Sequence, residues 1–114
     1  MKNMKKLLLP ALLGFAGCIS FQFAERFNAG SYRGEGTGHN GAIVVEVETD
    51  SASILDINII EQHEDALVGG EAMRELKEQI LEEDSTFVDA ISGATITSEG
   101  FLHAVDEALS HGRR

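Results

Sequence analysis

Two stretches in the middle of the chain alternate between apolar and polar side chains, the pattern of half-buried β-strands. In residues 42–49 (AIVVEVET) three β-branched side chains share one face and two glutamates share the other. Residues 54–61 (ILDINIIE) repeat the alternation, and Leu55, Ile57 and Ile59 are expected to point inward. A short polar turn separates the two stretches. They are therefore expected to pair as an antiparallel hairpin.

Helical periodicity follows in the second half of the chain. After a loop over residues 62–70, apolar positions in residues 71–83 recur at helical spacing with charges between them. A closing amphipathic helix is marked by Phe101, Leu102, Ala104, Val105, Ala108 and Leu109. Thr97 or Ser98 is expected to cap its N-terminus. The pattern predicts a small α+β domain, a meander of antiparallel strands covered by two helices.

Glycines dominate the segment before the first strand. Residues 25–41 hold five of the twelve glycines and are expected to form a linker that runs into a short strand. Gly34, Gly36 and Gly38 resemble a G-x-G phosphate loop, but such loops open a helix, whereas a strand follows here. The glycines are instead expected to permit a bend or a close approach of two backbones.

The first 24 residues have the order of a bacterial export signal. A basic start over residues 1–6 leads into an uncharged apolar run over residues 7–19. Cys18 ends this run after Ala16 and Gly17, which resembles a lipoprotein box with Phe15 where leucine is usual. Cys18 is thus a candidate for lipid attachment.

Two other fates of this segment stay open. The apolar character continues to Ala24, which makes the run about long enough for an uncleaved membrane anchor. A cleaved signal that leaves a secreted protein is the third possibility. All three predict an extracytoplasmic protein with an export segment at 1–24 and a folded domain at 25–114, and the first two attach it to the cell membrane.

Charge and cysteine content exclude two classes of protein. The chain of 114 residues has 9 basic and 19 acidic side chains. Three of the basic residues lie in the export segment, so the folded part is strongly acidic and is not expected to bind nucleic acid. The single cysteine cannot form a disulfide within the chain. No metal site is expected either, because the four histidines show no zinc-type spacing.

Hydroxyl groups gather where the last helix is expected to begin. In residues 89–98 (DAISGATITS), a turn at Gly93 brings Thr95 to the mouth of a helix that starts near Thr97. The N-terminus of a helix favours an anion, above all a phosphate. A plain helix cap built from serine and threonine is the alternative interpretation.

The same stretch resembles the flavin-attachment motif D-x-x-S/T-G-A-T of the FMN-binding domain family, whose members include flavin-bearing components of the sodium-translocating NADH:quinone reductase and of the Rnf complex. The matching residues are Asp89, Ser92, Gly93, Ala94 and Thr95, followed by Thr97 and Ser98. The resemblance extends over roughly residues 30–110. The loop HEDALVGG departs from a common family form in which Glu-Thr precedes Pro-Gly.

The resemblance implies a covalent cofactor. FMN would be joined through its phosphate to the Thr95 hydroxyl, in a reaction carried out by a separate flavin transferase with FAD as donor. Thr95 is an acceptor rather than a catalytic residue, because the chain has no Ser-His-Asp set and no G-x-S-x-G elbow. Gly93 and Ala94 would allow close approach, and Asp89 would hold the turn or be recognised by the transferase. Ser92, Thr97 and Ser98 would donate hydrogen bonds to phosphate oxygens.

Other side chains are assigned more ordinary roles. Tyr32, Phe87 and Phe101 are the rings available to a flavin, although core or surface positions suit each of them better. His63 is a loop residue that could lie near the flavin. The acidic residues of the loops and helix faces are expected to be solvated, and they are Glu61, Glu64, Asp65, Glu82, Glu83 and Asp84.

Two functions follow from these observations. The first is an exported, membrane-attached electron carrier with FMN on Thr95, which exchanges electrons with a membrane donor or acceptor protein. The second is a non-redox acidic surface lipoprotein or binding module of the same fold, which binds FMN reversibly or not at all. A flavoenzyme with its own substrate is disfavoured, because so short a chain leaves little room for a substrate pocket.

Overall fold

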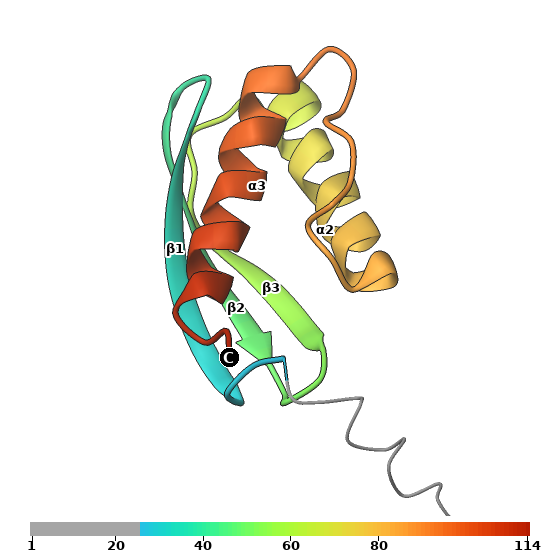
Figure 1. Cartoon of the computed structure of the whole chain (residues 1–114). Helices are drawn as coiled ribbons and strands as arrows, with labels where there is room; N and C mark the ends of the chain where they lie inside the picture. Colours follow the sequence, from blue (N-terminus) through green and yellow to red (C-terminus); the bar gives the residue numbers. More distant parts are fainter. Residues whose placement is uncertain (1–25) are drawn as a thin grey trace, which may run out of the picture.

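The computed structural model describes residues 26–114. The elements are β1 (Gly30–Gly38), β2 (Gly41–Thr49), β3 (Ile54–Glu61), the short π-helical turn η2 (Ala66–Gly70), α2 (Glu71–Glu83) and α3 (Thr95–Ser110). The strands form one antiparallel sheet in the order β1-β2-β3, and α2 and α3 lie on one face of it (Figure 1). The predicted α+β meander is confirmed. The export segment and Cys18 lie outside the described residues.

The glycine-rich segment forms a full strand instead of the expected linker. β1 pairs with β2 along its whole length, from Gly30 opposite Thr49 to Gly38 opposite Gly41. The glycines at alternate positions are buried and face the helices. A Cβ atom on Gly36 would collide with the carbonyl of Gly100 in α3. Close backbone approach, as predicted, is therefore the role of these glycines, and it is compatible with a regular strand.

The core lies between the sheet and the two helices. The inward face of β2 is fully buried, as the alternation predicted, and α2 and α3 contribute the apolar faces that their periodicity indicated. The large core side chains are Phe27, Ile43, Val45, Val47, Ile57, Met73, Leu76, Ile80, Phe101, Val105 and Leu109. This packing fixes α3 against the sheet and thereby fixes the position of its N-terminus.

β3 differs from its predicted alternation. Ile57 is buried, but Leu55 is 54% exposed and Ile59 is 38% exposed. The pairing passes from Asp56 opposite Glu48 to Ile54 opposite Thr49, so Leu55 is left without a partner in a bulge. Ile54 therefore takes the inward position. Ile59 lies opposite buried Val45, but β3 is an edge strand and its inward face is only partly covered there.

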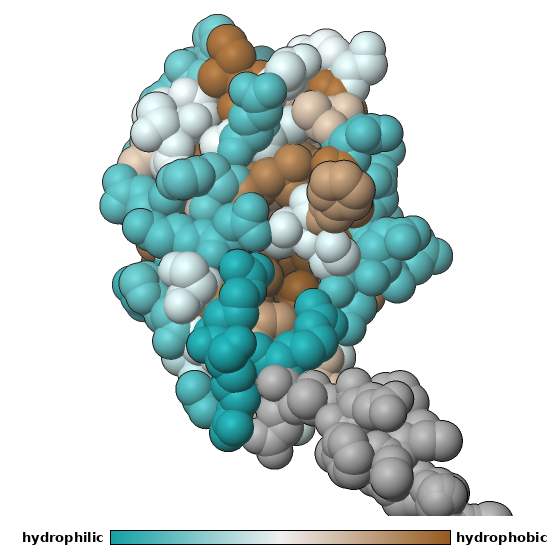
Figure 2. Space-filling view, viewed as in Figure 1, coloured by the Kyte–Doolittle hydropathy of each residue, from teal (hydrophilic) through white to brown (hydrophobic). Residues whose placement is uncertain are grey.

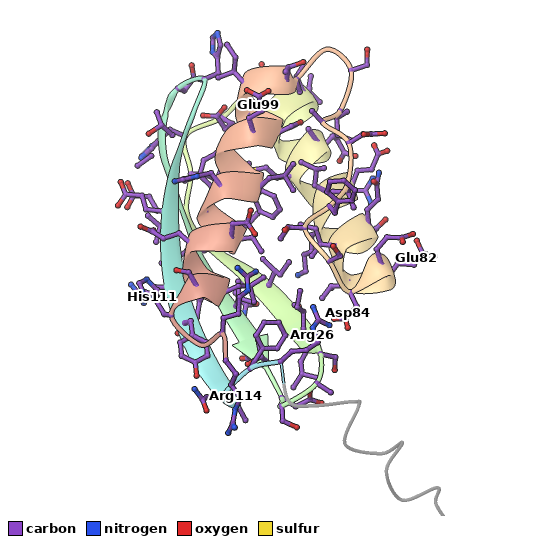
Figure 3. All side chains as sticks on the ribbon, viewed as in Figure 1. Arg26, Glu82, Asp84, Glu99, His111 and Arg114 are labelled. Carbon is purple, nitrogen blue, oxygen red and sulfur yellow. The ribbon has the colours of Figure 1, made fainter. Side chains whose placement is uncertain are left out.

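The two ends of the described chain meet at the end of the molecule opposite the start of α3 (Figure 1). The Asn28 N–H donates to the Gly112 carbonyl at 2.7 Å, and the Arg114 N–H donates to the Arg26 carbonyl at 2.9 Å. Figure 3 shows Arg26 and Arg114 at this end and Glu99 at the other. The paired chain ends and the N-terminus of α3 therefore lie at opposite ends of the domain.

Asp84 is a structural residue, contrary to the expectation that it is simply solvated. It ends α2 in the left-handed conformation with φ 56°. Its carboxylate accepts a hydrogen bond from the Ile54 N–H at 2.8 Å and pairs with Arg26 at 2.6 Å. These contacts join the end of α2 to the start of β3. Within residues 26–114, none of the helices has the length and apolar character needed to span a membrane.

Candidate functional site

The last helix begins at Thr95, two residues earlier than predicted. Ala94 occupies the N-cap position, and no side chain caps the helix. Thr97 and Ser98, the expected caps, lie inside the first turn and are buried. The reason is a turn closed by a hydrogen bond from the Ala94 N–H to the Ile91 carbonyl at 3.0 Å, which completes the loop before Thr95. The exposed side chain of Thr95 thus belongs to the first residue of an uncapped helix.

Gly93 makes this turn possible. Its φ of 87° lies in the left-handed region that favours glycine, and a Cβ there would meet no atom within 4 Å. The predicted turn at Gly93, which places Thr95 at the N-terminus of the helix, is confirmed. The open space beside Gly93 leaves its backbone accessible from solvent.

Ser98 supports the turn from inside. It is 0% exposed, and its hydroxyl donates to the Ala94 carbonyl at 2.7 Å and accepts from the Ile91 N–H at 3.0 Å. The expected role of this hydroxyl, donation to a phosphate oxygen, does not agree with this geometry. The single hydrogen of the Ser98 hydroxyl is already donated to the Ala94 carbonyl. Ser98 instead holds the loop in the shape that exposes Thr95.

A pocket of about 420 Å³ opens at this helix terminus. Its walls come from the β1–β2 turn, the segment before α2, and the loop and first turn of α3. The lining residues are His39, Asn40, Glu64, Asp65, Val68, Gly69, Gly93, Ala94, Thr95, Ile96 and Thr97. Of the seven predicted cofactor residues, Gly93, Ala94, Thr95 and Thr97 line this pocket, whereas Asp89, Ser92 and Ser98 do not.

Asp89 and Ser92 lie on the outer surface of the loop. Both are exposed, and within residues 26–114 neither side chain makes a hydrogen bond. The expectation that Asp89 holds the turn through backbone N–H groups is wrong, because Ala94 and Ser98 already close that turn. Recognition of Asp89 by a modifying enzyme stays a prediction.

Glu64 is one of the site residues that the sequence pattern did not reveal. Expected to be solvated, it is 8% exposed and lies beneath the pocket. Its carboxylate accepts hydrogen bonds from the His39 N–H at 2.9 Å, from the Asn40 N–H at 2.8 Å and from the Thr97 hydroxyl. One carboxylate therefore joins the β1–β2 turn, the loop before α2 and the first turn of α3.

These contacts keep Glu64 ionised. Burial by itself raises the pKa of a carboxyl group, but hydrogen bonds from Thr97 and from the backbone N–H groups of Asn40 and His39 outweigh it and hold the pKa of Glu64 below its ordinary value of 4.5. The pocket thus has a fixed negative charge in its wall. No local pattern in the sequence marks this role, because the partner hydroxyl is 33 residues away.

A Glu64→Gln variant should lose about 1–3 kcal/mol of unfolding free energy at neutral pH, because the amide leaves one of the buried donors unpaired. Urea denaturation measures the loss. Glu61→Gln is the matched control: Glu61 is exposed and pairs only with exposed His63, so the change should stay within about 0.5 kcal/mol. Equal effects of the two substitutions would contradict the structural role of Glu64.

The effect of Glu64→Gln should also depend on pH. The pKa of Glu64 is lower in the folded protein than in the unfolded chain, so its carboxylate adds stability above the unfolded pKa. That contribution is lost as the pH falls through the folded pKa. Urea titrations at a series of pH values should therefore show the wild type and the variant converging as the pH falls through the folded pKa, which lies below the ordinary value of 4.5. A constant difference across the series would contradict this linkage.

Apolar surface around the pocket comes from aliphatic side chains rather than from the rings considered above. Phe101 is fully buried in the core, Phe87 is 96% exposed outside the pocket, and the Tyr32 hydroxyl donates to the Asn28 carbonyl. The pocket walls instead present Val68 and Ile96, which are 52% and 56% exposed. Figure 2 shows apolar side chains at the surface near the upper end of the molecule, where α3 begins.

An anion at this pocket would have to be bound mainly by backbone N–H groups. No lysine or arginine is among the lining residues, and Glu64 and Asp65 contribute negative charge. The first N–H groups of an α-helix have no intrahelical acceptor and carry a positive partial charge. Because no side chain caps α3, these groups are available to a phosphate beside the Thr95 hydroxyl. The donors present therefore fit a phosphate ester at Thr95.

His39, rather than His63, is the histidine at the pocket, and His63 is an exposed loop residue, the ordinary role assigned to it from the sequence. His63 is exposed and pairs with Glu61 at 3.0 Å, whereas His39 lines the pocket beside Asn40. The GHNG sequence of the β1–β2 turn is the signal that could have placed His39, because a hairpin turn lies at the end of the sheet. In the part of the chain that the structure describes, no group of three or more His, Cys, Asp or Glu side chains could hold a metal ion.

Comparison with known proteins agrees with this geometry. A family model described as FMN-binding domain matches residues 38–110, which is more than half of the chain. An NADH:acrylate oxidoreductase from Vibrio harveyi is 36% identical over 84 residues, covering 74% of this chain and 8% of the relative. A urocanate reductase from Eggerthella lenta is 35% identical over 108 residues, covering 89% of this chain and 18% of the relative.

A third relative, an uncharacterized protein from Treponema pallidum, is 30% identical over 80 residues, or 70% of this chain. The chain spans less than a quarter of the length of each of these three relatives. The matched region contains the pocket, Glu64 and the whole of the loop and helix that present Thr95. The chain belongs to the FMN-binding domain family.

Proposed function

We propose that the domain is an electron carrier that holds FMN through a phosphoester bond to the hydroxyl of Thr95. The observation that carries the proposal is the position of Thr95. Its exposed side chain stands at the first residue of an uncapped helix and at the rim of the pocket. A phosphate attached there would accept hydrogen bonds from the free N–H groups of the helix.

Attachment requires a separate enzyme. Within residues 26–114, no hydrogen bond joins the Thr95 hydroxyl to a side chain that could act as a base. A flavin transferase would activate this hydroxyl for attack on the phosphorus of the FMN half of FAD. A bond forms between the Thr95 oxygen and that phosphorus, the pyrophosphate bond breaks, AMP leaves, and the proton of the hydroxyl is released to the enzyme's base.

The flavin ring would lie over the pocket. An apolar, planar ring system suits a surface formed by Val68 and Ile96, which belong to different segments and are both exposed at the pocket. The negative charges of Glu64 and Asp65 would disfavour an anionic reduced flavin and lower its reduction potential. The domain therefore supplies an orienting surface and an electrostatic environment.

Electron transfer is favoured over substrate turnover. The two relatives with assigned activities are named as an oxidoreductase and a reductase and are much longer than this chain. The feature that they share with it is the FMN-binding domain, which supports a redox role for that domain. We propose an electron donor or acceptor protein at the membrane as its partner.

Tethering of the flavin suits the proposed location outside the cytoplasm. A reversibly bound cofactor would be lost there by dilution, whereas an attached one stays at high effective concentration. We propose that residues 1–24 direct export and attach the domain to the membrane, through a lipid on Cys18 or as an uncleaved anchor. Mass spectrometry of the mature N-terminus tests this: a lipidated Cys18 supports the lipoprotein, an intact Met1 supports the anchor, and cleavage with an unmodified N-terminus contradicts attachment.

Co-expression of the full chain with a flavin transferase tests the function. Denaturing electrophoresis should give a band with flavin fluorescence, and the native protein should be bleached by dithionite and recover its yellow colour with an oxidant. A protein that is non-fluorescent in the denaturing gel contradicts the covalent link. Flavin that washes off, or no flavin at all, supports the alternative binding module.

A further inference from the structure

The neutral imidazole of His39 is held in one tautomer by its neighbour Asn40. The Asn40 Nδ2 atom donates to the His63 carbonyl at 3.1 Å, and this identifies the other terminal atom of the amide as its oxygen. That oxygen lies 3.0 Å from Nδ1 of His39. Because an amide oxygen can only accept, Nδ1 carries the hydrogen and Nε2 of the neutral ring has none.

The backbone of the β1–β2 turn fixes the place of this ring at the pocket. The N–H groups of His39 and Asn40 donate to the two carboxylate oxygens of Glu64, at 2.9 Å and 2.8 Å. The exposed side chain of His39 lines the same pocket as Thr95. Within residues 26–114, Nε2 of His39 makes no hydrogen bond. The turn therefore brings a basic nitrogen without a partner to the pocket.

The titratable groups around the His39 ring are mostly carboxylates. Two line the pocket from the loop before α2, two form an exposed pair at the end of β3, and one lies near the start of α3 outside the pocket; they are Glu64 and Asp65, Glu61 with His63, and Glu99. After burial and its three hydrogen bonds, the charge of His39 is the next influence on the pKa of Glu64 and lowers it. Since neither lysine nor arginine lines the pocket, a protonated His39 is the one cationic side chain available among the lining residues.

We propose that His39 takes up a proton at Nε2 when electrons reach a flavin on Thr95, and so balances the negative charge that they bring into the pocket. The inference rests on the proposed attachment of FMN to Thr95. The electrons come from the donor protein and the proton comes from solvent. One N–H bond forms at Nε2, and the imidazole becomes imidazolium. When the acceptor protein takes the electrons, Nε2 returns its proton to solvent.

The geometry suits this exchange. Electrons that enter a pocket with two carboxylates are opposed by their charges, and a positive charge nearby offsets that opposition. Imidazole is the side chain whose charge can change near neutral pH. Because Nδ1 donates to Asn40 in both charge states of the ring, proton uptake needs no movement of the turn. Asn40 is therefore a positioning residue that keeps Nε2 free for the proton.

The tautomer can be observed without any flavin. Nitrogen NMR of the imidazole rings in the flavin-free full chain, purified in detergent, should show neutral His39 protonated at Nδ1. The signals that disappear in His39→Gln identify this ring. Asn40→Ala removes the acceptor and should abolish the preference. A neutral His39 protonated at Nε2 in the wild type overturns the inference.

Redox titration of the flavin-loaded full chain tests the coupling. In the neutral pH range, the reduction potential of the wild type should fall more steeply with pH than that of His39→Gln, by up to about one proton per reduction. Glutamine keeps the backbone N–H bond to Glu64 but cannot take up a proton. His63→Gln is the matched control, because His63 is paired with Glu61 outside the pocket. Its pH profile should follow that of the wild type.

The outcomes separate this inference from the proposed function. A wild type that acquires no covalent flavin overturns the attachment and, with it, the coupling. A loaded wild type with the same pH profile as His39→Gln overturns the role of His39 and leaves the attachment standing. An equal loss of slope in His63→Gln also overturns that role, because a ring outside the pocket would then serve as well. Thermal unfolding of His39→Gln should match the wild type, since the side chain is exposed.

Discussion

A Thr95→Val variant co-expressed with a flavin transferase should carry no flavin that survives denaturation. Valine has nearly the shape of threonine but replaces the hydroxyl oxygen, the only atom of that side chain able to form the phosphoester. The loss should therefore be complete rather than partial. In-gel fluorescence and intact mass of the denatured chain measure it.

The position of Thr95 means that the substitution should remove the attachment site without disturbing the fold. Its side chain is exposed, and the cap of α3 does not depend on its hydroxyl, so the free energy of unfolding should change by no more than about 0.5 kcal/mol. Thr37→Val is the matched control, because Thr37 is an exposed threonine on β1 outside the pocket. Retention of covalent flavin by Thr95→Val would move the attachment to another hydroxyl.

Comparison of the two threonine variants also distinguishes attachment from binding. If Thr95→Val still binds FMN reversibly, the pocket and the free N–H groups of α3 suffice to hold the phosphate without the ester bond. Equilibrium dialysis under native conditions measures this binding. Fluorescence that survives denaturation in Thr37→Val but not in Thr95→Val would assign the covalent bond to Thr95 alone.

Local patterns predicted the elements whose structure depends on neighbouring residues. The helical spacing over residues 71–83 coincides with α2, and the strand predicted over residues 54–61 coincides with β3 in its bounds, although not in which side chains face inward. The turn at Gly93 followed from a local backbone requirement, φ 87°. Periodicity indicates which face of an element is apolar, and for these segments one apolar face decides the conformation.

Features set by distant residues could not be predicted in this way. Glu64 is buried because its hydrogen-bond partners come from the β1–β2 turn and from Thr97. The residue pattern of its own loop does not indicate these partners. The bulge at Leu55 depends on the register against β2. Asp84 belongs to the same group, since Ile54 and Arg26 make it structural. In each case the fold supplies the partner, and the fold is not visible in the local pattern.

The same distinction between local and distant residues applies to the candidate site. The motif placed the attachment residue and its turn correctly, because these residues are adjacent in the sequence. The opposite walls of the pocket come from segments 24 or more residues before Gly93, and His39, Val68 and Gly69 were missed as a result. Sequence thus located the reactive end of the site, and the packing of α3 on the sheet was needed to locate the surface that would orient a flavin.

Gly36→Ala should be among the most destabilising single substitutions in this domain. Gly36 is buried on the face of β1 that meets α3, and an added methyl group would overlap the backbone carbonyl of Gly100. Neither the added methyl group nor the carbonyl of Gly100 can turn aside, because both are fixed to the backbone. The helix α3 would therefore have to move away from the sheet. We expect a loss of about 3 kcal/mol or more, at the upper end of the usual cost of overpacking.

Urea denaturation of Gly36→Ala and Gly70→Ala measures the effect against a matched control. Gly70 has helical dihedral angles, φ −62° and ψ −44°, and an added Cβ would lie 3.6 Å from its nearest neighbour. Gly70→Ala should therefore leave the unfolding free energy unchanged or raise it by up to about 1 kcal/mol. The loss in Gly36→Ala should extend to flavin attachment, because displacement of α3 also moves Thr95. Similar unfolding curves for the two variants would mean that β1 and α3 do not pack as closely as the structure shows.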